Sequence, residues 1–350
     1  MKNIAVIFGG RSSEHEVSCV SVTTIIKNID KSRYNLYLIG ITKEGEWLLC
    51  DSPADIESGE WYNSKKKAVI SPDVKDHGIL ITDNGEVSRV YIDVIFPVLH
   101  GLYGEDGTLQ GLFTLADIPY VGCGVLSSAV CMDKFFTKII VDTLNIRQAK
   151  YVPVYSEELV SIEKTVRRIE AALSYPVFVK PSNAGSSKGV SKAHDAGELM
   201  DALLLAAKHD RKILVEETIV GRELECAVFG GRKSTASGIG EVVAADEFYS
   251  YDAKYNNEAS RTVIGPELPA GKEEEIREKA TAIFKAVDGF GLSRVDFFLE
   301  KDTDEVVFNE INTLPGFTSI SMYPMLFKAA GTDTDKLVEG LIELAYKRQG

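Results

Sequence analysis

Acidic and basic side chains with the spacing of a metal site lie near the carboxyl end of the chain. Arg294-Val295-Asp296 is followed, after a charged and turn-prone stretch, by Glu310-Ile311-Asn312. Because side chains alternate between the two faces of a strand, Arg294 shares a face with Asp296, and Glu310 with Asn312. A hairpin in suitable register would collect a guanidinium, two carboxylates and an amide on one face. Such oxygen ligands suit Mg²⁺, which also takes substrate phosphates; a surface hairpin with solvated charges is the alternative.

A loop rich in glycine and serine, residues 183–189, follows a predicted strand that ends at Lys180. Glycine has no Cβ, so the backbone can approach a phosphate closely and donate its N–H groups. The loop matches neither the GxxxxGK[ST] pattern nor the GxGxxG fingerprint. Alone it is equally consistent with a structural turn, but Lys180 and the downstream hairpin favour phosphate binding.

Two further polar loops follow apolar strands in the first third of the chain. Glu14 and Glu16 lie at a predicted helix start, where they either complement the helix dipole or bind a substrate ammonium group. His100 opens the second loop, at a position where ligands often bind in open α/β sheets. A lone histidine is more often structural, so both interpretations of His100 stay open.

Composition limits the class of protein. The 350 residues are 45% hydrophobic and 26% charged, typical of a soluble globular protein of roughly two or three domains. No apolar run is long enough to span a membrane, and the amino terminus lacks a signal peptide, so we expect a cytoplasmic protein without a membrane partner. A net charge of −13 argues against nucleic acid as a partner. The five scattered cysteines predict free thiols, and the dispersed histidines make a zinc site unlikely.

The elements that must position these loops can be predicted from hydrophobic patterning. Strands alternate with helices over residues 1–123, which favours a parallel sheet covered by helices, with 51–67 as a surface excursion. A helix capped by Ser127 or Ser128 should carry Lys134, and a second helix should cover about 157–173. Downstream we expect strands at 225–229 and 236–243, a helix from about 273 and a closing helix near 336–346.

Taken together and in order, these segments resemble the D-alanine–D-alanine ligases of the ATP-grasp superfamily over nearly the whole chain. The matching motifs are Gly9-Gly10 with Ser13-Glu14 and Glu16-Val17-Ser18, His100-Gly101 with Gly104-Glu105-Asp106-Gly107-Thr108, Met132-Asp133-Lys134, Val179-Lys180-Pro181 with Gly185-Ser186-Ser187, Val215-Glu216-Glu217, Tyr251-Asp252-Ala253-Lys254-Tyr255, Arg294-Val295-Asp296, and Glu310-Ile311-Asn312 continuing to Thr318.

The resemblance implies a mixed α/β (α+β) protein with the ATP-grasp fold. A Rossmann-like parallel-sheet domain would occupy residues 1–123. A central ATP-grasp subdomain with the glycine-rich phosphate loop would occupy 124–215, and a C-terminal subdomain with the metal site and a closing loop 216–350.

The resemblance also implies an activity. The carboxylate of a first D-alanine would attack the γ-phosphate of ATP to give D-alanyl phosphate and ADP. The amine of a second D-alanine would then displace phosphate, forming a dipeptide for peptidoglycan precursors. Two Mg²⁺ ions, with Mn²⁺ as a substitute, would be held by Asp296, Glu310 and Asn312, and K⁺ would be an assisting cation.

Roles for other residues follow from the same resemblance. The implied ATP contacts are Lys134, Lys180, Gly185, Ser186, Ser187, Glu216, Glu217, Ile219, Glu223, Phe298 and Asn309. The implied substrate contacts are Glu14 and His100, with Lys254, Ser321 and Met322 at the second D-alanine. Glu14, Ser186 and Tyr255 would form a hydrogen-bonded triad, and Arg294 and the Gly316 N–H would stabilise an oxyanion.

The sequence is compatible with several alternatives. Glu217-Thr218 replaces a lysine and an aromatic residue found in many members, which should change packing around the base. The first domain resembles the longer-insert members, which include ligases for D-serine or D-lactate. Retention of Lys254-Tyr255 and an apolar Met322 favour D-alanine, whereas D-serine is harder to exclude. A catalytically silent ATP-binding regulator is a further alternative. Relatives are commonly dimers, so a homodimer is expected.

Overall fold

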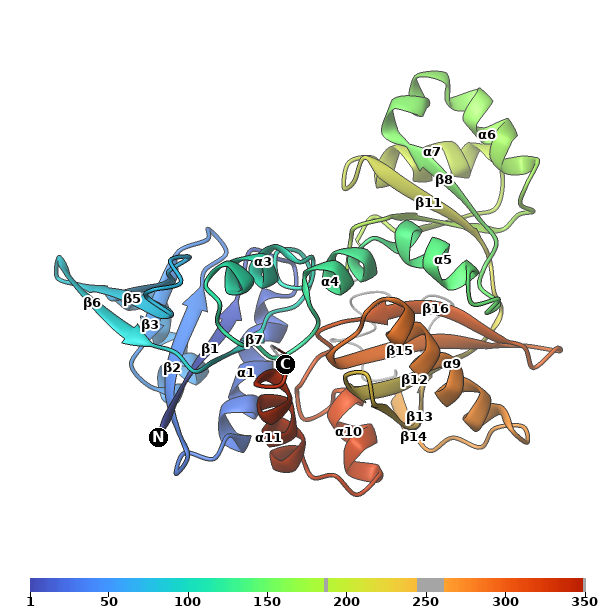
Figure 1. The fold of residues 1–350 in the computed structure, drawn as a ribbon. Helices are drawn as coiled ribbons and strands as arrows, with labels where there is room; N and C mark the ends of the chain where they lie inside the picture. The colour runs from blue at the N-terminus through green and yellow to red at the C-terminus, as the bar shows by residue number, and fades with distance from the viewer. Residues whose placement is uncertain (186–187, 244–260, 349–350) are drawn as a thin grey trace.

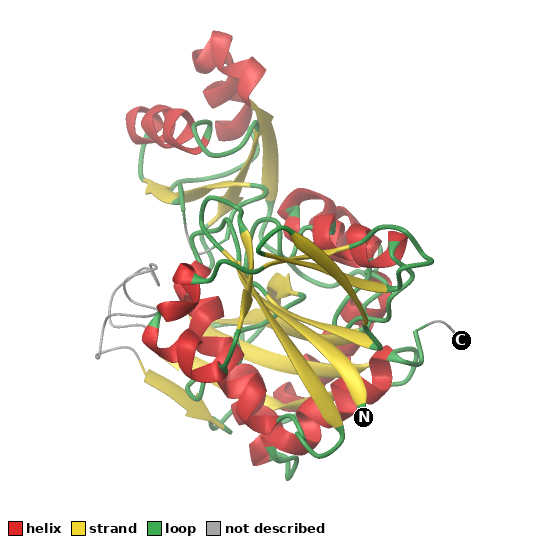
Figure 2. Ribbon diagram, turned by 90° about the vertical axis from the view of Figure 1, so that its left-hand side faces the viewer, coloured by secondary structure: helices red, strands yellow, loops and turns green. Residues whose placement is uncertain are grey.

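The structure, a computed structural model, describes residues 1–185, 188–243 and 261–348, and the elements given below lie within these ranges. Three β-sheets follow one another along the chain, each covered by helices (Figures 1 and 2). No helix within the described ranges is long and apolar enough to cross a membrane.

The first sheet confirms the α/β prediction and refines it. Its strand order is β6-β5-β4-β3-β2-β1-β7, and the parallel pairing that we expected holds for β2-β1-β7. The outer strands pair antiparallel. Short connections such as the Asn84-Gly85 turn, with positive φ at both residues, permit only hairpins, whereas β3 and β4 are joined through α2 and η1. The elements are β1 Lys2–Gly9, α1 His15–Asn28, β2 Tyr34–Ile41, β3 Trp47–Cys50, α2 Pro53–Ser58, η1 Glu60–Asn63, β4 Lys67–Ile70, β5 Gly78–Asp83, β6 Glu86–Tyr91, β7 Val94–Val98 and α3 Thr108–Leu115.

The expected surface excursion at 51–67 is wrong for its middle. Trp61 is only 2% exposed and packs edge-on against Phe8, with ring centroids 5.0 Å apart. The indole lies over Gly40, where a Cβ would stand 2.3 Å from the ring. The charged neighbours of Trp61 masked this core residue in the sequence.

The second sheet has the antiparallel order β10-β9-β11-β8 and stands apart from the first sheet in Figure 1. One correction concerns the helix that precedes it. Gly124, not a serine, precedes α4, and Ser127 and Ser128 are buried inside that helix. The elements of this part are α4 Val125–Met132, α5 Lys134–Asp142, β8 Tyr151–Tyr155, η2 Ser156–Ser161, α6 Ile162–Glu170, β9 Val177–Pro181, β10 Ser191–Ala193, α7 Ala196–Ala206 and β11 Lys212–Glu217.

The third sheet is antiparallel, with the order β14-β13-β12-β15-β16. On one side α9 covers it through the predicted stripe that includes Ile276, Ala280 and Phe284, all fully buried. The last helix, α11, crosses back to the first sheet and lies beside α1, so the first and last parts of the chain share one core (Figure 1). The elements are β12 Gly221–Gly230, β13 Ser234–Val243, β14 Arg261–Ile264, α9 Lys272–Ala286, β15 Gly291–Glu300, β16 Val306–Asn312, α10 Met322–Ala329 and α11 Thr334–Ala345.

Candidate active site

The predicted acidic hairpin is present as β15 and β16. Asp296 lies opposite Glu310 in the register, and Arg294 lies opposite Asn312. The Asn312 amide donates to Asp296 Oδ2 at 3.0 Å, so the amide and the carboxylate meet on one face. A register shift directly after Asp296 marks a bulge, a feature that often re-aims side chains beside functional sites.

Arg294 neutralises acidic side chains on this face. Its guanidinium donates to both Asp296 oxygens at 2.7 Å, and its Nε lies 3.0 Å from Glu225 Oε2. Burial alone would lower the pKa of Arg294, but the charges of Asp296 and Glu225 raise it well above its usual range. Arg294 is therefore a fixed cation whose position is set by carboxylates from two strands.

The donor set of the hairpin fits Mg²⁺. Two carboxylates and an amide are oxygen ligands, and Mg²⁺ commonly completes its coordination with water and phosphate oxygens. Among the described residues, no group of three His, Cys, Asp or Glu side chains could hold a metal ion. A site of this hairpin would thus depend on Asn312 and on a phosphate-bearing ligand as well as on Asp296 and Glu310.

A cavity of about 450 Å³ opens in front of the hairpin and extends to the second sheet. Its described lining comes from the second and third sheets and from α4 and α5, and loops of the first part, with Glu14, Gly101 and Glu105, close one end. The predicted site residues that line it are Glu14, Lys134, Lys180, Gly185, Glu216, Glu217, Ile219, Glu223, Asp296, Phe298, Asn309, Glu310 and Asn312. Residues scattered over the sequence are thus gathered around one space of the size of a small-molecule site.

A buried ion triad forms one wall of this cavity. Glu216 on β11 is bound by Lys138 of α5, at 2.7 Å, and by Lys180 of β9. Burial would raise the pKa of Glu216, but the two ammonium groups outweigh burial and lower it, so the carboxylate is ionised. Sequence reasoning missed Lys138. Its place four residues after Lys134, on the same helix face, was the available indication.

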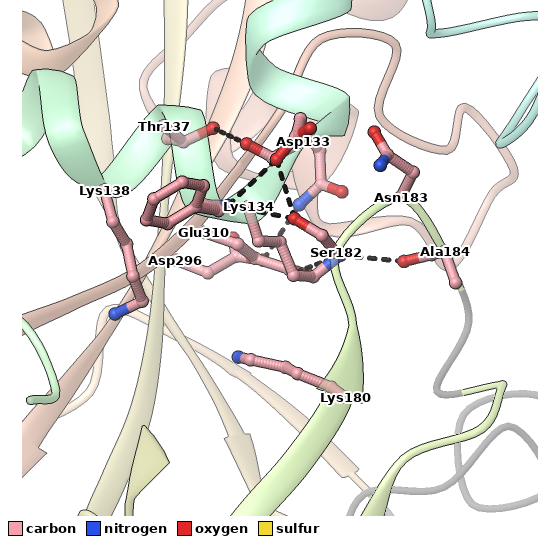
Figure 3. Close-up of polar contacts among 12 residues, drawn as sticks. Asp133, Lys134, Thr137, Lys138, Lys180, Ser182, Asn183, Ala184, Asp296 and Glu310 are labelled. Carbon is pink, nitrogen blue, oxygen red and sulfur yellow. Dashed lines mark hydrogen bonds and ion pairs between the residues drawn. The ribbon is translucent and has the colours of Figure 1, made fainter. Parts of the chain in front are cut away.

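Lys134 reaches across the cavity between two elements (Figure 3). Its ammonium donates to the Ala184 carbonyl at 2.7 Å, at the start of the glycine-rich loop, and lies 3.8 Å from Glu310 Oε2. One cation thereby faces both the predicted phosphate loop and the predicted metal hairpin.

The loops of the first part meet the other end of the cavity. The carboxylate of Glu14 is packed between two glycines: a Cβ on Gly101 would stand 2.7 Å from Glu14 Oε2, and one on Gly185 3.0 Å. Glu14 is therefore adjacent to the glycine-rich loop, although the two are far apart in the sequence.

Glu105 is a second acid at this end that sequence reasoning did not select. It lines the cavity and accepts the N–H groups of Gly101, at 2.7 Å, and Leu314, at 2.9 Å. Burial and then the charge of Glu14 raise the pKa of Glu105 to about 8, against the two N–H donors, which lower it. The carboxyl ties the loop after β7 to the loop after β16.

Five predicted residues lie outside the described lining of the cavity. His100 is 5% exposed, and its ring nitrogens contact the Leu314 carbonyl at 2.9 Å and Ser21 Oγ at 3.1 Å. Burial lowers the pKa of His100, which fits the structural interpretation of a neutral ring. The others are Arg294, Gly316, Ser321 and Met322.

The Gly316, Ser321 and Met322 side of the site is held by local contacts. Ser321 Oγ accepts from the Thr318 N–H at 2.9 Å, and a Cβ on Gly316 would stand 2.9 Å from that oxygen. Met322 is 5% exposed and packs against Gly240 in the core. Ser186, Ser187, Lys254 and Tyr255 lie outside the described residues.

The remaining wall of the cavity includes Glu217, next to Thr218. These are the two residues at which the sequence departs from the family that it resembles. Glu217 Oε1 accepts from Arg147, at 2.7 Å, and from the Lys150 N–H, at 2.8 Å, while Thr218 donates to the Pro176 carbonyl. The apolar groups of Phe178, Val190 and Phe298 line the adjoining space. Glu217 is consequently committed to contacts within the protein.

Solved structures with the same architecture identify the class of protein. The chain has a TM-score of 0.90 and 40% identity with VanG D-Ala:D-Ser ligase from Enterococcus faecalis, covering 98% of this chain and 99% of that one. With the D-alanine-D-alanine ligase from Coxiella burnetii the TM-score is 0.87 at 33% identity, covering 99% and 94%. The sheets and the cavity between them are therefore those of an ATP-grasp ligase.

Sequence comparisons narrow this class to a family. The model for the D-ala D-ala ligase N-terminus matches residues 3–123, and that for the C-terminus matches 140–343. D-alanine–D-alanine ligases of Acetivibrio thermocellus and Ruminiclostridium cellulolyticum are 52% and 53% identical, each match covering 99% of this chain and 96% of the relative. The chain belongs to the D-alanine–D-alanine ligase family, whose members form a peptide bond with ATP.

Proposed function

We propose that this chain joins two D-alanine molecules at the expense of ATP, and that the dipeptide enters peptidoglycan precursors. The observation that carries the proposal is the cavity in which Lys134, Lys180, Asp296 and Glu310 converge, in a chain of this family. A triphosphate needs cations, and a carboxylate that attacks it needs its own charge neutralised. Both requirements are met where the lysines face the acidic hairpin.

ATP would lie along the cavity from the second sheet to the hairpin. Lys134, Lys180 and the loop at Gly185, with Ser186 and Ser187, would hold the phosphates. The adenine and ribose would be contacted by Glu216, Ile219, Glu223, Phe298 and Asn309. Glu217, held by Arg147 and the Lys150 N–H, would border the base without a hydrogen bond to it. Because Glu216 is already held by Lys138 and Lys180, its acceptor oxygens are in fixed positions before a ligand arrives.

Asp296, Glu310 and Asn312 would hold two Mg²⁺ ions, or Mn²⁺ in their place, which supply positive charge beside the phosphates. K⁺ is proposed as an assisting cation. An assay that replaces K⁺ with a bulky organic cation tests that part separately.

The first D-alanine would place its ammonium group at Glu14 and its carboxylate toward the γ-phosphate. Attack forms D-alanyl phosphate and ADP. The deprotonated amine of the second D-alanine then attacks the acyl carbon, and phosphate leaves. Arg294 and the Gly316 N–H would stabilise the oxyanion, His100 would support the first substrate, and Lys254, Ser321 and Met322 would bind the second. Glu14, Ser186 and Tyr255 would link the parts of the site while water is excluded.

Release of phosphate tests the function. The purified protein with ATP and Mg²⁺ should release phosphate with D-alanine and form D-alanyl-D-alanine. Turnover with L-alanine and none with D-alanine would contradict the stereochemical assignment. Tyr255→Phe should relax the preference for D-alanine over D-lactate as second substrate, and an unchanged preference would count against the role of Tyr255.

A D-alanine–D-serine ligase is the second candidate, because VanG D-Ala:D-Ser ligase is 40% identical over 98% of this chain. A small pocket rejects an added hydroxyl only weakly, which adds to this case. Competition between equal concentrations of D-alanine and D-serine, with the products separated by mass, decides between the two. A silent ATP-binding regulator would give no product with either.

We also propose a domain division, an oligomeric state and a cellular location for this chain. The division into domains at 1–123, 124–215 and 216–350 can be checked by limited proteolysis. A homodimer can be checked by sedimentation, and a cytoplasmic location by fractionation of the source cells.

A further inference from the structure

A buried carboxylate that the proposed mechanism does not use lies where α4 meets α5. Asp133 is 7% exposed, and its Oδ1 accepts from Ser182 Oγ at 2.6 Å. The same oxygen accepts the N–H groups of Phe135 and Phe136, at 3.2 and 3.3 Å, which caps α5. Its Oδ2 is paired with the buried ammonium of Lys212. Figure 3 shows Asp133 and Ser182 pointing toward one another.

Backbone hydrogen bonds reinforce this joint. The Lys134 N–H donates to the Ser182 carbonyl at 3.0 Å, and the Ser182 N–H donates to the Lys212 carbonyl at 2.9 Å. Ser182 Oγ also accepts from the Phe135 N–H at 3.2 Å. The start of α5 is therefore bonded to the end of β9 and to the start of β11, two adjacent strands of one sheet.

The joint lies directly behind the two lysines that we assign to the phosphates. Lys134, the first residue of α5, follows Asp133 directly, and Lys180, on β9, lies two residues before Ser182. Lys134 and Lys180 line the cavity, whereas its described lining does not include Asp133, Ser182 or Lys212. A shift of α5 along the sheet would move one ammonium group relative to the other.

We propose that Asp133 and Ser182 are positioning residues that set the placement of Lys134 relative to Lys180 and thereby the affinity for the triphosphate of ATP. This inference rests on the proposed function insofar as ATP is the ligand. The alternative is that Asp133 and Ser182 have a purely structural role, in which a helix cap and a buried ion pair contribute only to stability. A positioning role predicts that replacing these residues weakens nucleotide binding. A purely structural role predicts that only the free energy of unfolding falls.

Ser182→Ala is the test variant, because it removes the hydroxyl between helix and strand and leaves the Asp133–Lys212 pair. The matched control is Ser237→Ala in β13. Ser237 is also buried, at 2% exposed, and its hydroxyl accepts from the Ala227 N–H at 3.0 Å, but it is not part of the described cavity lining. Both variants lose one buried hydroxyl that donates one hydrogen bond and accepts another, so similar losses of stability are expected.

The readouts are the Kd for adenylyl imidodiphosphate with Mg²⁺ by calorimetry, the KM for ATP, the KM for D-alanine and the urea midpoint. Ser182→Ala should raise the Kd and the KM for ATP by about fivefold, the scale of one weakened hydrogen bond, and change the KM for D-alanine by less than about twofold. Ser237→Ala should leave both nucleotide values unchanged.

Nucleotide affinity that stays within about twofold in Ser182→Ala, with a urea midpoint lowered as in Ser237→Ala, would overturn the inference. An equal rise of both KM values would do the same. If Ser182→Ala does not fold, Ser182→Cys replaces it, since a thiol is only a weak hydrogen-bond donor to Asp133 but leaves the Asp133–Lys212 pair intact, and the same rise in Kd is expected. Wild-type protein that binds the analogue but forms no dipeptide would contradict the proposed function, while the comparison of Kd values would still decide the inference.

Discussion

Lys138 on α5 and Glu216 on β11 form a buried ion pair of 2.7 Å. At the other end of the same helix–strand contact, Asp133, which caps α5, is paired with Lys212 of β11. The polarity is reversed between the two pairs, with the acid on the helix in one and on the strand in the other. A displacement of the helix along the strand would leave each buried charge without its partner, which is costly. The two pairs together fix the register of α5, which carries Lys134.

Lys138→Met should lower the free energy of unfolding by about 3 kcal/mol, the range for breaking a buried pair by removing one partner. Glu216 would keep Lys180, so the protein should still fold. The measurement is urea unfolding at neutral pH. Lys279→Met is the control, because Lys279 pairs with a more exposed glutamate, Glu275, and should lose less than about 1 kcal/mol. If the free energy of unfolding fell equally in the two variants, the buried triad would not be more stabilising than the more exposed pair, and the prediction would be wrong.

Glu310→Gln should abolish dipeptide formation at all Mg²⁺ concentrations, because the amide cannot supply the charge that would hold the metal ions beside the phosphates. Its fold should be intact, since Glu310 is partly exposed at the cavity. Glu300→Gln, at the end of β15 and outside the described lining, is the control and should keep normal turnover. Full activity of Glu310→Gln would refute the metal role.

The sequence predicted the hairpin and the loops at the site because these are local patterns. Alternation along a strand placed Asp296 with Arg294 and Glu310 with Asn312, and the register confirms that these residues face one another. Hydrophobic stripes likewise predicted α9 and α11. Such patterns depend only on neighbours in the chain.

The parts that were missed depend on contacts between distant segments. Glu105 meets Leu314, 209 residues later, and Lys138 meets Glu216 on another element. Trp61 was assigned to the surface because its neighbours are charged, yet it packs over Gly40. In each case the burial depends on a tertiary partner that the local sequence does not reveal.

Glu105 should make stability depend on pH above the acidic range. Its pKa is raised from the usual 4.5 to about 8, so the folded state binds this proton more tightly than the unfolded chain does. The contribution to the free energy of unfolding is therefore fully present below about pH 4.5 and is lost as pH rises through about 8. Urea unfolding at intervals from pH 5 to 9 measures the slope.

Glu105→Gln is the matched variant for this slope, because it is similar in shape, keeps an acceptor for Leu314 and does not titrate. It should remove most of the difference in stability between pH 5 and pH 9. A variant with the same pH profile as wild type would show that another group is responsible. His100→Gln is a second comparison, since the pKa of His100 is shifted in the opposite direction by burial.

Glu217 should contribute to stability more than to nucleotide binding. Its Oε1 accepts from Arg147 and from the Lys150 N–H, and both charged side chains are about three-quarters buried. Glu217→Lys would set an ammonium group beside the Arg147 guanidinium, so the free energy of unfolding should fall by about 2 kcal/mol. The Kd for adenylyl imidodiphosphate should change little, because Glu216 retains Lys138 and Lys180.

The double variant Arg147→Glu/Glu217→Lys reverses the pair and should recover about half of the loss, since the Lys150 N–H stays without its carboxylate. No recovery in the double variant, or a large change in Kd with unchanged stability, would instead assign Glu217 to the base.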